Sequence, residues 1–167
     1  MRRLAAIFAF LTLCALSTCS AVGSEYVDIK EVTMRLEGGN ATFELNYNLD
    51  TFTRFYVTTL GCRYLEPELI SFLGGYGDVR LVKADTEGAA LQVVGAGKYN
   101  SGYYLFDSMP FGTKDKPRKE GIARFSVVYP GGRVRTFYNV TSTQNVFSQA
   151  AKPLASPVKA KSQPTKR

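Results

Sequence analysis

EVTMRLEGGNATFELNYNLD, which spans residues 31–50, is the stretch that determines the fold. Hydrophobic and polar residues alternate on both sides of Gly38-Gly39, which is typical of strands with one buried side and one solvent-facing side. The hydrophobic positions are Val32, Met34 and Leu36 before the glycines, and Phe43, Leu45, Tyr47 and Leu49 after them. Because glycine can adopt the positive φ of a tight turn, the stretch predicts an antiparallel hairpin.

The hydrophobic phase changes just upstream of this hairpin. Val27 and Ile29 lie on the opposite parity from Val32, so the alternation slips near Lys30-Glu31. An extra residue in one strand produces such a slip. The sequence therefore predicts either a β-bulge at this point or a break between two short strands.

Two short helices are predicted after the hairpin. Asp50 can cap the first helix, although its threonine and aromatic content leaves a strand as the alternative. The residues at helical spacing are Phe52, Phe55, Tyr56, Thr59 and Leu60. The second helix begins at Glu66-Pro67-Glu68, where proline suits the first turn, and ends at the glycines of residues 74–77. We expect both helices to pack on one face of a sheet.

The remaining segments supply further strands. They are predicted at residues 79–84, 89–94, 103–106, 122–129 and 133–140. The expected fold is therefore α+β. It has a mostly antiparallel sheet of about seven strands, with two short helices between the second and third strands packed on one face. Residues 24–149 form a single domain of this kind.

The N-terminus has the order of a secretory signal. Arg2-Arg3 precede an apolar run over residues 4–16, and small and polar residues follow. A signal peptide is predicted over residues 1–23, with cleavage after Ala21 or Gly23. Two alternatives remain open: an uncleaved membrane anchor, or lipidation of Cys19, where Thr18 departs from the usual bacterial pattern. Each of the three predicts an exported protein, extracellular or in the cell envelope.

The formal net charge of +7 is confined to the two ends of the chain. Residues 24–149 carry 14 basic and 14 acidic side chains, whereas residues 150–167 carry five basic side chains and no acid. A segment of this composition, with three prolines, is expected to be a disordered basic tail. Its charges could contact an anionic membrane or cell-wall surface, and no specific nucleic acid is expected as a partner. These charges are Lys152, Lys159, Lys161, Lys166 and Arg167.

The chain contains no histidine, which excludes Ser-His-Asp triads, Cys-His dyads and histidine metal sites built from this chain alone. Cys62 is the one cysteine left after signal cleavage, and we interpret it as a half-buried apolar residue. Glu66 and Glu68 lie two apart on a helix, so they do not converge as a catalytic pair. No catalytic residue, metal site or cofactor is predicted.

Three features remain as candidate sites. The sequons at Asn40 and Asn139 are expected at exposed positions and are compatible with N-glycosylation. A dense aromatic segment could stack on sugar rings or on a partner protein. Its candidate members are Tyr99, Tyr103, Tyr104 and Phe106.

The chain also resembles a group of small exported proteins of unknown function from archaea, especially methanogens. The resemblance covers residues 26–145. It rests on Leu49-Asp50-Thr51-Phe52, Leu65-Glu66-Pro67, Tyr129-Pro130-Gly131-Gly132-Arg133 and Tyr138-Asn139-Val140-Thr141. It implies a compartment outside the cytoplasm and no catalytic residue.

The sequence favours a non-enzymatic exported domain, secreted or at the cell surface, with a binding or envelope-associated role. One alternative is a small secreted hydrolase that uses carboxylates. Another is binding of an anionic polymer or nucleic acid through the basic C-terminal tail.

Overall fold

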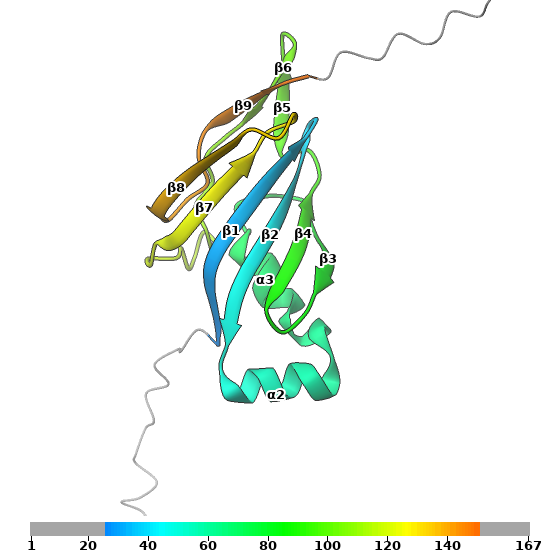
Figure 1. The fold of residues 1–167 in the computed structure, drawn as a ribbon, viewed down its shortest axis with the longest axis vertical. Coiled ribbons are helices and arrows are strands. Elements are labelled where there is room, and N and C mark those ends of the chain that lie inside the picture. The colour runs from blue at the N-terminus through cyan, green and yellow to red at the C-terminus, as the bar shows by residue number, and fades with distance from the viewer. Residues whose placement is uncertain (1–25, 151–167) are drawn as a thin grey trace, which may run out of the picture.

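The computed structural model describes residues 26–150, which form an α+β body of two sheets and two α-helices (Figure 1). One sheet has six strands in the order β3-β4-β2-β1-β7-β8, and the other has three in the order β5-β6-β9. The strands are β1 (Val27–Glu37), β2 (Asn40–Leu49), β3 (Val79–Ala84), β4 (Gly88–Val93), β5 (Gly97–Asn100), β6 (Tyr103–Phe106), β7 (Ile122–Val128), β8 (Val134–Val140) and β9 (Val146–Gln149). The helices are α2 (Thr51–Leu60), the short 3₁₀ turn η1 (Cys62–Leu65) and α3 (Glu66–Phe72).

The predicted hairpin forms the centre of the larger sheet. Strands β1 and β2 pair antiparallel, and Gly38 adopts a φ of 59° in the turn between them. Their register shifts between Ile29 and Glu31, which confirms the predicted irregularity at Lys30-Glu31. The shift lets Val27 and Ile29 join Val32 on the buried side of the sheet.

One face of the larger sheet is buried and the other is polar. The hydrophobic residues predicted on the inner side of β2 are buried, and rings from α3 and the later loop add to the core. Phe72 of α3 stacks on Phe111 with ring centroids 4.8 Å apart. On the outer face, Arg35 of β1 donates to Glu44 of β2 at 2.7 Å. This division explains the alternation in the sequence.

The structure corrects the predicted strand count and the predicted single sheet. The described residues contain nine strands in two sheets, because β5 and β9 add to β6 to make the smaller sheet. Strand β1 also pairs parallel with β7, so the larger sheet is mixed. Antiparallel pairs predominate nonetheless, and the α+β class is confirmed.

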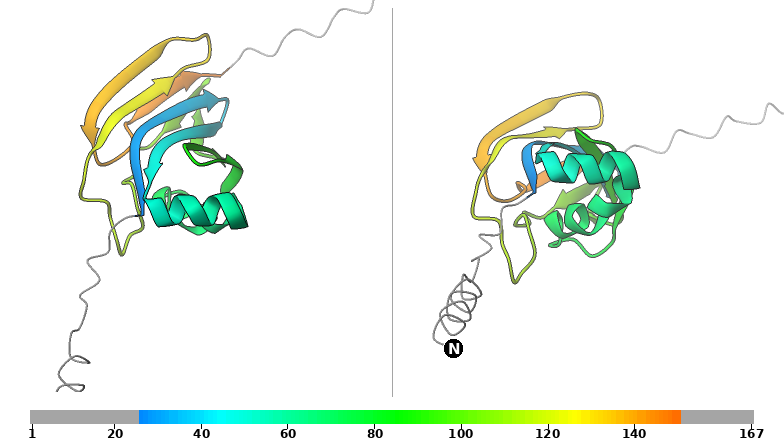
Figure 2. Two further views of the ribbon diagram at one scale, coloured as in Figure 1. Left: turned by 60° about the horizontal axis from the view of Figure 1, so that its bottom comes forward. Right: turned by 90° about the horizontal axis from the view of Figure 1, so that it is seen from below.

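The placement of the helices on one face is also corrected. Helix α3 lies against the buried face and contributes Leu69 and Phe72 to the core. Helix α2 instead lies across the end of the larger sheet, where β1 begins and β2 ends (Figures 1 and 2). Only Thr53 and Val57 of α2 are buried. The helix therefore caps an edge of the core and does not cover its face.

The two ends of the described chain lie at opposite ends of the body. Strand β1 begins beside α2, whereas β9 ends at the far end, next to β6 (Figure 1). Among residues 26–150, no helix is both long and apolar enough to span a membrane. The predicted signal peptide, Cys19 and the basic side chains of the tail lie outside the described residues.

Candidate binding surfaces

Helix α2 begins at the capping residue predicted from the sequence. The Asp50 carboxylate accepts hydrogen bonds from the backbone N–H groups of Phe52 and Thr53, at 2.8 and 3.0 Å. The Thr53 hydroxyl donates to the same carboxylate at 2.7 Å. These bonds to Thr53 and Phe52 favour the charged form and lower the pKa of Asp50. The helix ends at Gly61, whose φ is 89° and whose N–H donates to the carbonyl of Val57.

The hydrophobic stripe of α2 faces away from the protein. Phe52, Phe55 and Leu60 are 78%, 66% and 72% exposed, and Tyr56 is 48% exposed. A helix at the surface of a globular protein normally turns such a stripe toward the core. Here only Thr53 and Val57 are buried, so the aromatic side of α2 is left largely exposed within residues 26–150.

The polar groups on α2 are largely satisfied within the helix. The hydroxyls of Thr58 and Thr59 donate to the carbonyls of Arg54 and Phe55, at 2.8 and 2.9 Å. Because these hydroxyl protons are already bonded within the helix, they do not need water molecules as partners. Helix α2 can therefore enter a less polar environment at lower desolvation cost than its threonine content suggests.

Two tyrosines outside α2 extend the exposed stripe. Tyr64 of η1, 54% exposed, stacks on Tyr56 with ring centroids 6.1 Å apart. Tyr26, which precedes β1, helps to line a hollow of about 550 Å³ with Phe52, Tyr56 and Tyr64. We call this set the α2 aromatic surface: Tyr26, Phe52, Phe55, Tyr56, Leu60 and Tyr64.

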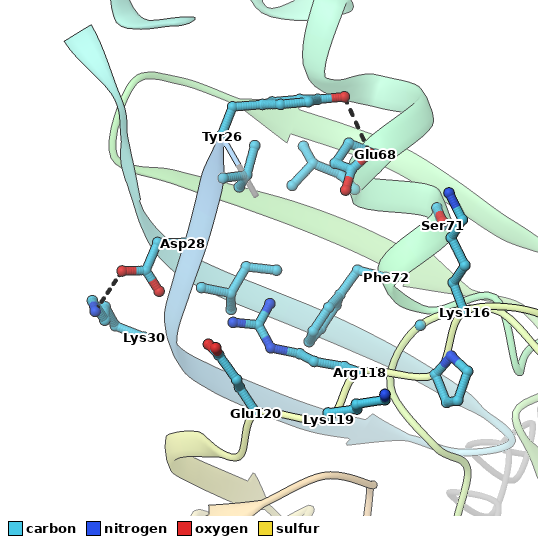
Figure 3. Close-up of a pocket in the computed structure, with 15 residues that line it drawn as sticks. Tyr26, Asp28, Lys30, Glu68, Ser71, Phe72, Lys116, Arg118, Lys119 and Glu120 are labelled. Carbon is cyan, nitrogen blue, oxygen red and sulfur yellow. Dashed lines mark hydrogen bonds and ion pairs between the residues drawn. The ribbon is translucent and has the colours of Figure 1, made fainter. Parts of the chain in front are cut away.

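A separate polar groove of about 910 Å³ lies between the start of β1, helix α3 and the segment of residues 112–120 (Figure 3). Its acidic side chains have different partners. Asp28 pairs with Lys30 at 2.5 Å, and Glu68 accepts from the Tyr26 hydroxyl at 3.3 Å. In Figure 3 the Glu120 carboxylate points toward Arg118. The groove thus mixes both charge signs, and a carboxylate pair for hydrolysis gains no support from these contacts.

The two acids of the helical insert, and Asp78 just before β3, have structural roles. Glu66 and Glu68 occupy the first turn of α3, where their negative charges interact favourably with the positive end of the helix dipole. Asp78 accepts two hydrogen bonds from Arg80 at 3.0 and 3.1 Å. Within residues 26–150, no group of three or more acidic or cysteine side chains could hold a metal ion. Cys62 is half-buried against the core.

The predicted aromatic segment is divided between two sides of β6. Tyr103 is 47% exposed and contacts Phe147 of β9 edge-on, with ring centroids 6.3 Å apart. Tyr104 lies half-buried on the opposite side of β6. There the Tyr99 ring contacts it edge-on, with ring centroids 5.4 Å apart. Phe106 is fully buried and belongs to the core, which corrects its place among the candidate surface residues.

The two sequons lie in different environments. Asn139 is exposed near the end of β8 and has a φ of 52°, in the left-handed region that asparagine tolerates. Asn40 opens β2 and is half-buried, and its side-chain oxygen accepts from the backbone N–H of Gly95 at 3.0 Å. Of the two, Asn139 has the more accessible side chain, and glycosylation remains a prediction for both.

Comparison of the chain with protein-family models, curated proteins and solved structures gives no match. Function is therefore inferred from the chemistry of the chain itself. The α2 aromatic surface is the site that the sequence did not predict as a surface. Helical spacing identified Phe52, Phe55, Tyr56 and Leu60, but the same spacing is typical of a stripe that packs on a core. Tyr26 and Tyr64 are not predicted from the sequence, because only the tertiary structure brings them beside α2.

Proposed function

We propose that this protein is an exported, non-enzymatic domain, secreted or at the cell surface, that acts by binding within or at the cell envelope. The observation that carries the proposal is the α2 aromatic surface. Large contiguous apolar patches are uncommon on proteins that work as isolated monomers, and they typically mark sites of interaction.

The composition of this surface supports a binding role. Tyrosine and phenylalanine offer large contact areas with few rotatable bonds, so little conformational entropy is lost when they bind. The stacked pair Tyr56 and Tyr64 has part of its side-chain order set before any partner arrives. A preorganised aromatic surface lowers the cost of association.

The N-terminal sequence supports export. A basic pair, an apolar run over residues 4–16 and small residues near Ala21 follow the order of a secretory signal. The resemblance to exported archaeal proteins implies the same compartment. Residues 24–149 carry no net formal charge, so the body has no overall positive charge that would attract a polyanionic partner.

Fractionation of the native host, with mass spectrometry of the protein's N-terminus, tests this proposal. We expect the protein in the envelope or the medium, starting at Val22 or Ser24. Retention of residues 1–21 in the envelope fraction would identify the anchored form, and a lipid mass on Cys19 the lipidated form. Recovery of the intact chain with a cytoplasmic marker protein would overturn export. Intact mass would also show whether Asn40 or Asn139 carries a glycan.

A further inference from the structure

We infer that the α2 aromatic surface docks on a lipid bilayer and holds the exported domain at the membrane from which it emerges. The inference rests on the proposed function, because it requires an exported chain, and it names the partner of the binding surface. Three independent features support it: the chemistry of α2, its charge, and the position of the N-terminal end of the body.

The chemistry of α2 matches the membrane interface. Phe52, Phe55 and Leu60 project outward from one side of the helix and are each more than half exposed. Tyr56 and Tyr64 flank them with rings that have a polar tip, the arrangement that favours the boundary between headgroups and acyl chains. An amphipathic helix lying in the plane of a bilayer buries such a stripe.

The charge of the segment is also complementary to a membrane. From residue 51 to residue 65, the only charged side chains are Arg54 and Arg63, both exposed. Cations beside an apolar stripe are attracted to anionic headgroups, and each adds to the binding energy. Carboxylates border this segment at Asp50, which caps α2 and lines the same hollow, and at Glu66 and Glu68 in the first turn of α3, so the favourable charge is confined to residues 51–65.

The position of the chain's N-terminal end distinguishes a bilayer from other occupants. Tyr26 lines the hollow beside Phe52 and Tyr56, so the chain enters the body at the α2 aromatic surface. Residues 17–25, nine residues, connect it to the apolar run of residues 4–16. Even fully extended, that connection spans at most about 32 Å. While the signal segment occupies the membrane, the α2 aromatic surface is therefore held close to the lipid.

The far end of the body provides a matched control position. Phe147 of β9 has the same 66% exposure as Phe55 but lies in the smaller sheet, at the end away from α2 (Figure 1). Because the chain contains no tryptophan, a single Phe55→Trp or Phe147→Trp substitution gives one unambiguous fluorescent reporter. Both side chains are mostly exposed, so both variants should fold like the wild type.

The experiment uses the protein as its host processes it, mixed with zwitterionic phosphatidylcholine vesicles, which carry no net charge to attract the five basic side chains of residues 150–167. We expect the Phe55→Trp emission to move to shorter wavelength on vesicles and to be quenched by lipids brominated on their acyl chains. The Phe147→Trp emission should change little. Equal responses at both positions, or no response at position 55, would overturn the inference.

A second comparison measures affinity without a reporter. Replacing Phe52 and Phe55 by serine should lower the vesicle partition coefficient by at least about tenfold, whereas Phe147→Ser should leave it nearly unchanged. If the Phe55→Trp emission shifts without lipid as the protein concentration rises, the surface joins two copies of the chain, and bilayer docking is wrong. If the protein is exported but the wild type does not bind vesicles, bilayer docking is wrong, whereas the proposed function as an exported binding domain still stands.

Discussion

At the scale of single residues, Tyr47 shows how one side chain ties the central hairpin to the next. Its ring lies on the buried side of β2 and is 1% exposed. Its hydroxyl donates to the carbonyl of Asp85 at 2.7 Å and lies 3.1 Å from that of Gly88, across the β3–β4 turn. The Asp85 side chain accepts from the N–H groups of Glu87 and Gly88, at 2.9 and 2.8 Å, which fixes that turn. The turn and the hairpin are therefore stabilised together.

Removing the hydroxyl tests this link. Tyr47→Phe should lower the free energy of unfolding by about 1–2 kcal/mol at neutral pH, because the Asp85 carbonyl loses a partly buried hydrogen-bond donor. The matched control is Tyr138→Phe, since Tyr138 is 72% exposed and its hydroxyl forms no hydrogen bond within the described residues. Urea denaturation at neutral pH measures both changes. Equal stability of the wild type and Tyr47→Phe would show that the hydroxyl contributes nothing.

The same residue predicts a pH dependence. Burial, chiefly, raises the pKa of Tyr47 in the folded protein, so its proton is lost from the unfolded chain first. Its contribution to stability is complete below the unfolded pKa of about 10 and declines as the pH rises above that value. The wild type should therefore lose more stability than Tyr47→Phe between about pH 9 and about pH 11, roughly one unit below and above that pKa. Parallel losses in the two proteins would contradict this assignment.

At the scale of secondary-structure elements, sequence periodicity predicted which segments form helices and strands better than it predicted their partners. The hairpin, the irregularity at Lys30-Glu31 and the Asp50 cap follow from local rules, and the structure has all three. Strands β5 and β9 are four residues each and contain two polar side chains apiece, whereas β6, of the same length, is entirely hydrophobic and was predicted. Their pairing depends on distant backbone contacts, such as the bond from the Gly97 N–H to the Gly39 carbonyl at 2.9 Å.

Helix α2 shows the same limit for the candidate site. Its spacing places Phe52, Phe55 and Tyr56 on one side of a helix, which is correct. Spacing describes how side chains lie relative to one another, and it does not say whether another element covers them. The outward direction of the stripe depends on where β2 ends and on α3 occupying the sheet face, and both are properties of the tertiary structure.

Strand β6 offers a direct test of alternation within a candidate surface. Tyr103 faces outward, whereas Phe106 is fully buried and lies against β5, where a Cβ on Gly97 would approach its ring to 2.8 Å. Phe106→Ala should therefore cost about 3–5 kcal/mol of unfolding free energy. Tyr103→Ala, on the same strand, should change stability by no more than about 1 kcal/mol. Thermal denaturation of the two variants would show the difference, and similar losses would place Tyr103 in the core as well.

At the scale of the whole molecule, the α2 aromatic surface and the point where residues 151–167 begin lie at opposite ends of the body. The α2 aromatic surface lies where β1 begins, and β9 ends at the far end (Figure 1). The last described residue, Ala150, donates its N–H to the carbonyl of Gly102 in the β5–β6 turn at 2.9 Å. The sequence of residues 151–167 therefore continues from the end away from α2.

This geometry gives the basic segment a role separable from docking, which a truncation can test. A chain ending at Ala150 keeps its last backbone hydrogen bond to Gly102, so its melting temperature should match that of the full chain. Binding of the full chain to a soluble polyanion such as heparin should weaken with salt, with a log–log slope no steeper than about −4.5 for five cationic side chains. Titrations at several salt concentrations should show that the truncation abolishes this binding and leaves the Phe55→Trp response to zwitterionic vesicles unchanged.

A variant of full length with those five side chains replaced by glutamine should behave like the truncation, because charge and not length drives counterion release. Polyanion binding that survives both changes would place the cationic site on the body, although the basic and acidic side chains of residues 24–149 are equal in number. That result would contradict the assignment of polyanion binding to the C-terminal segment.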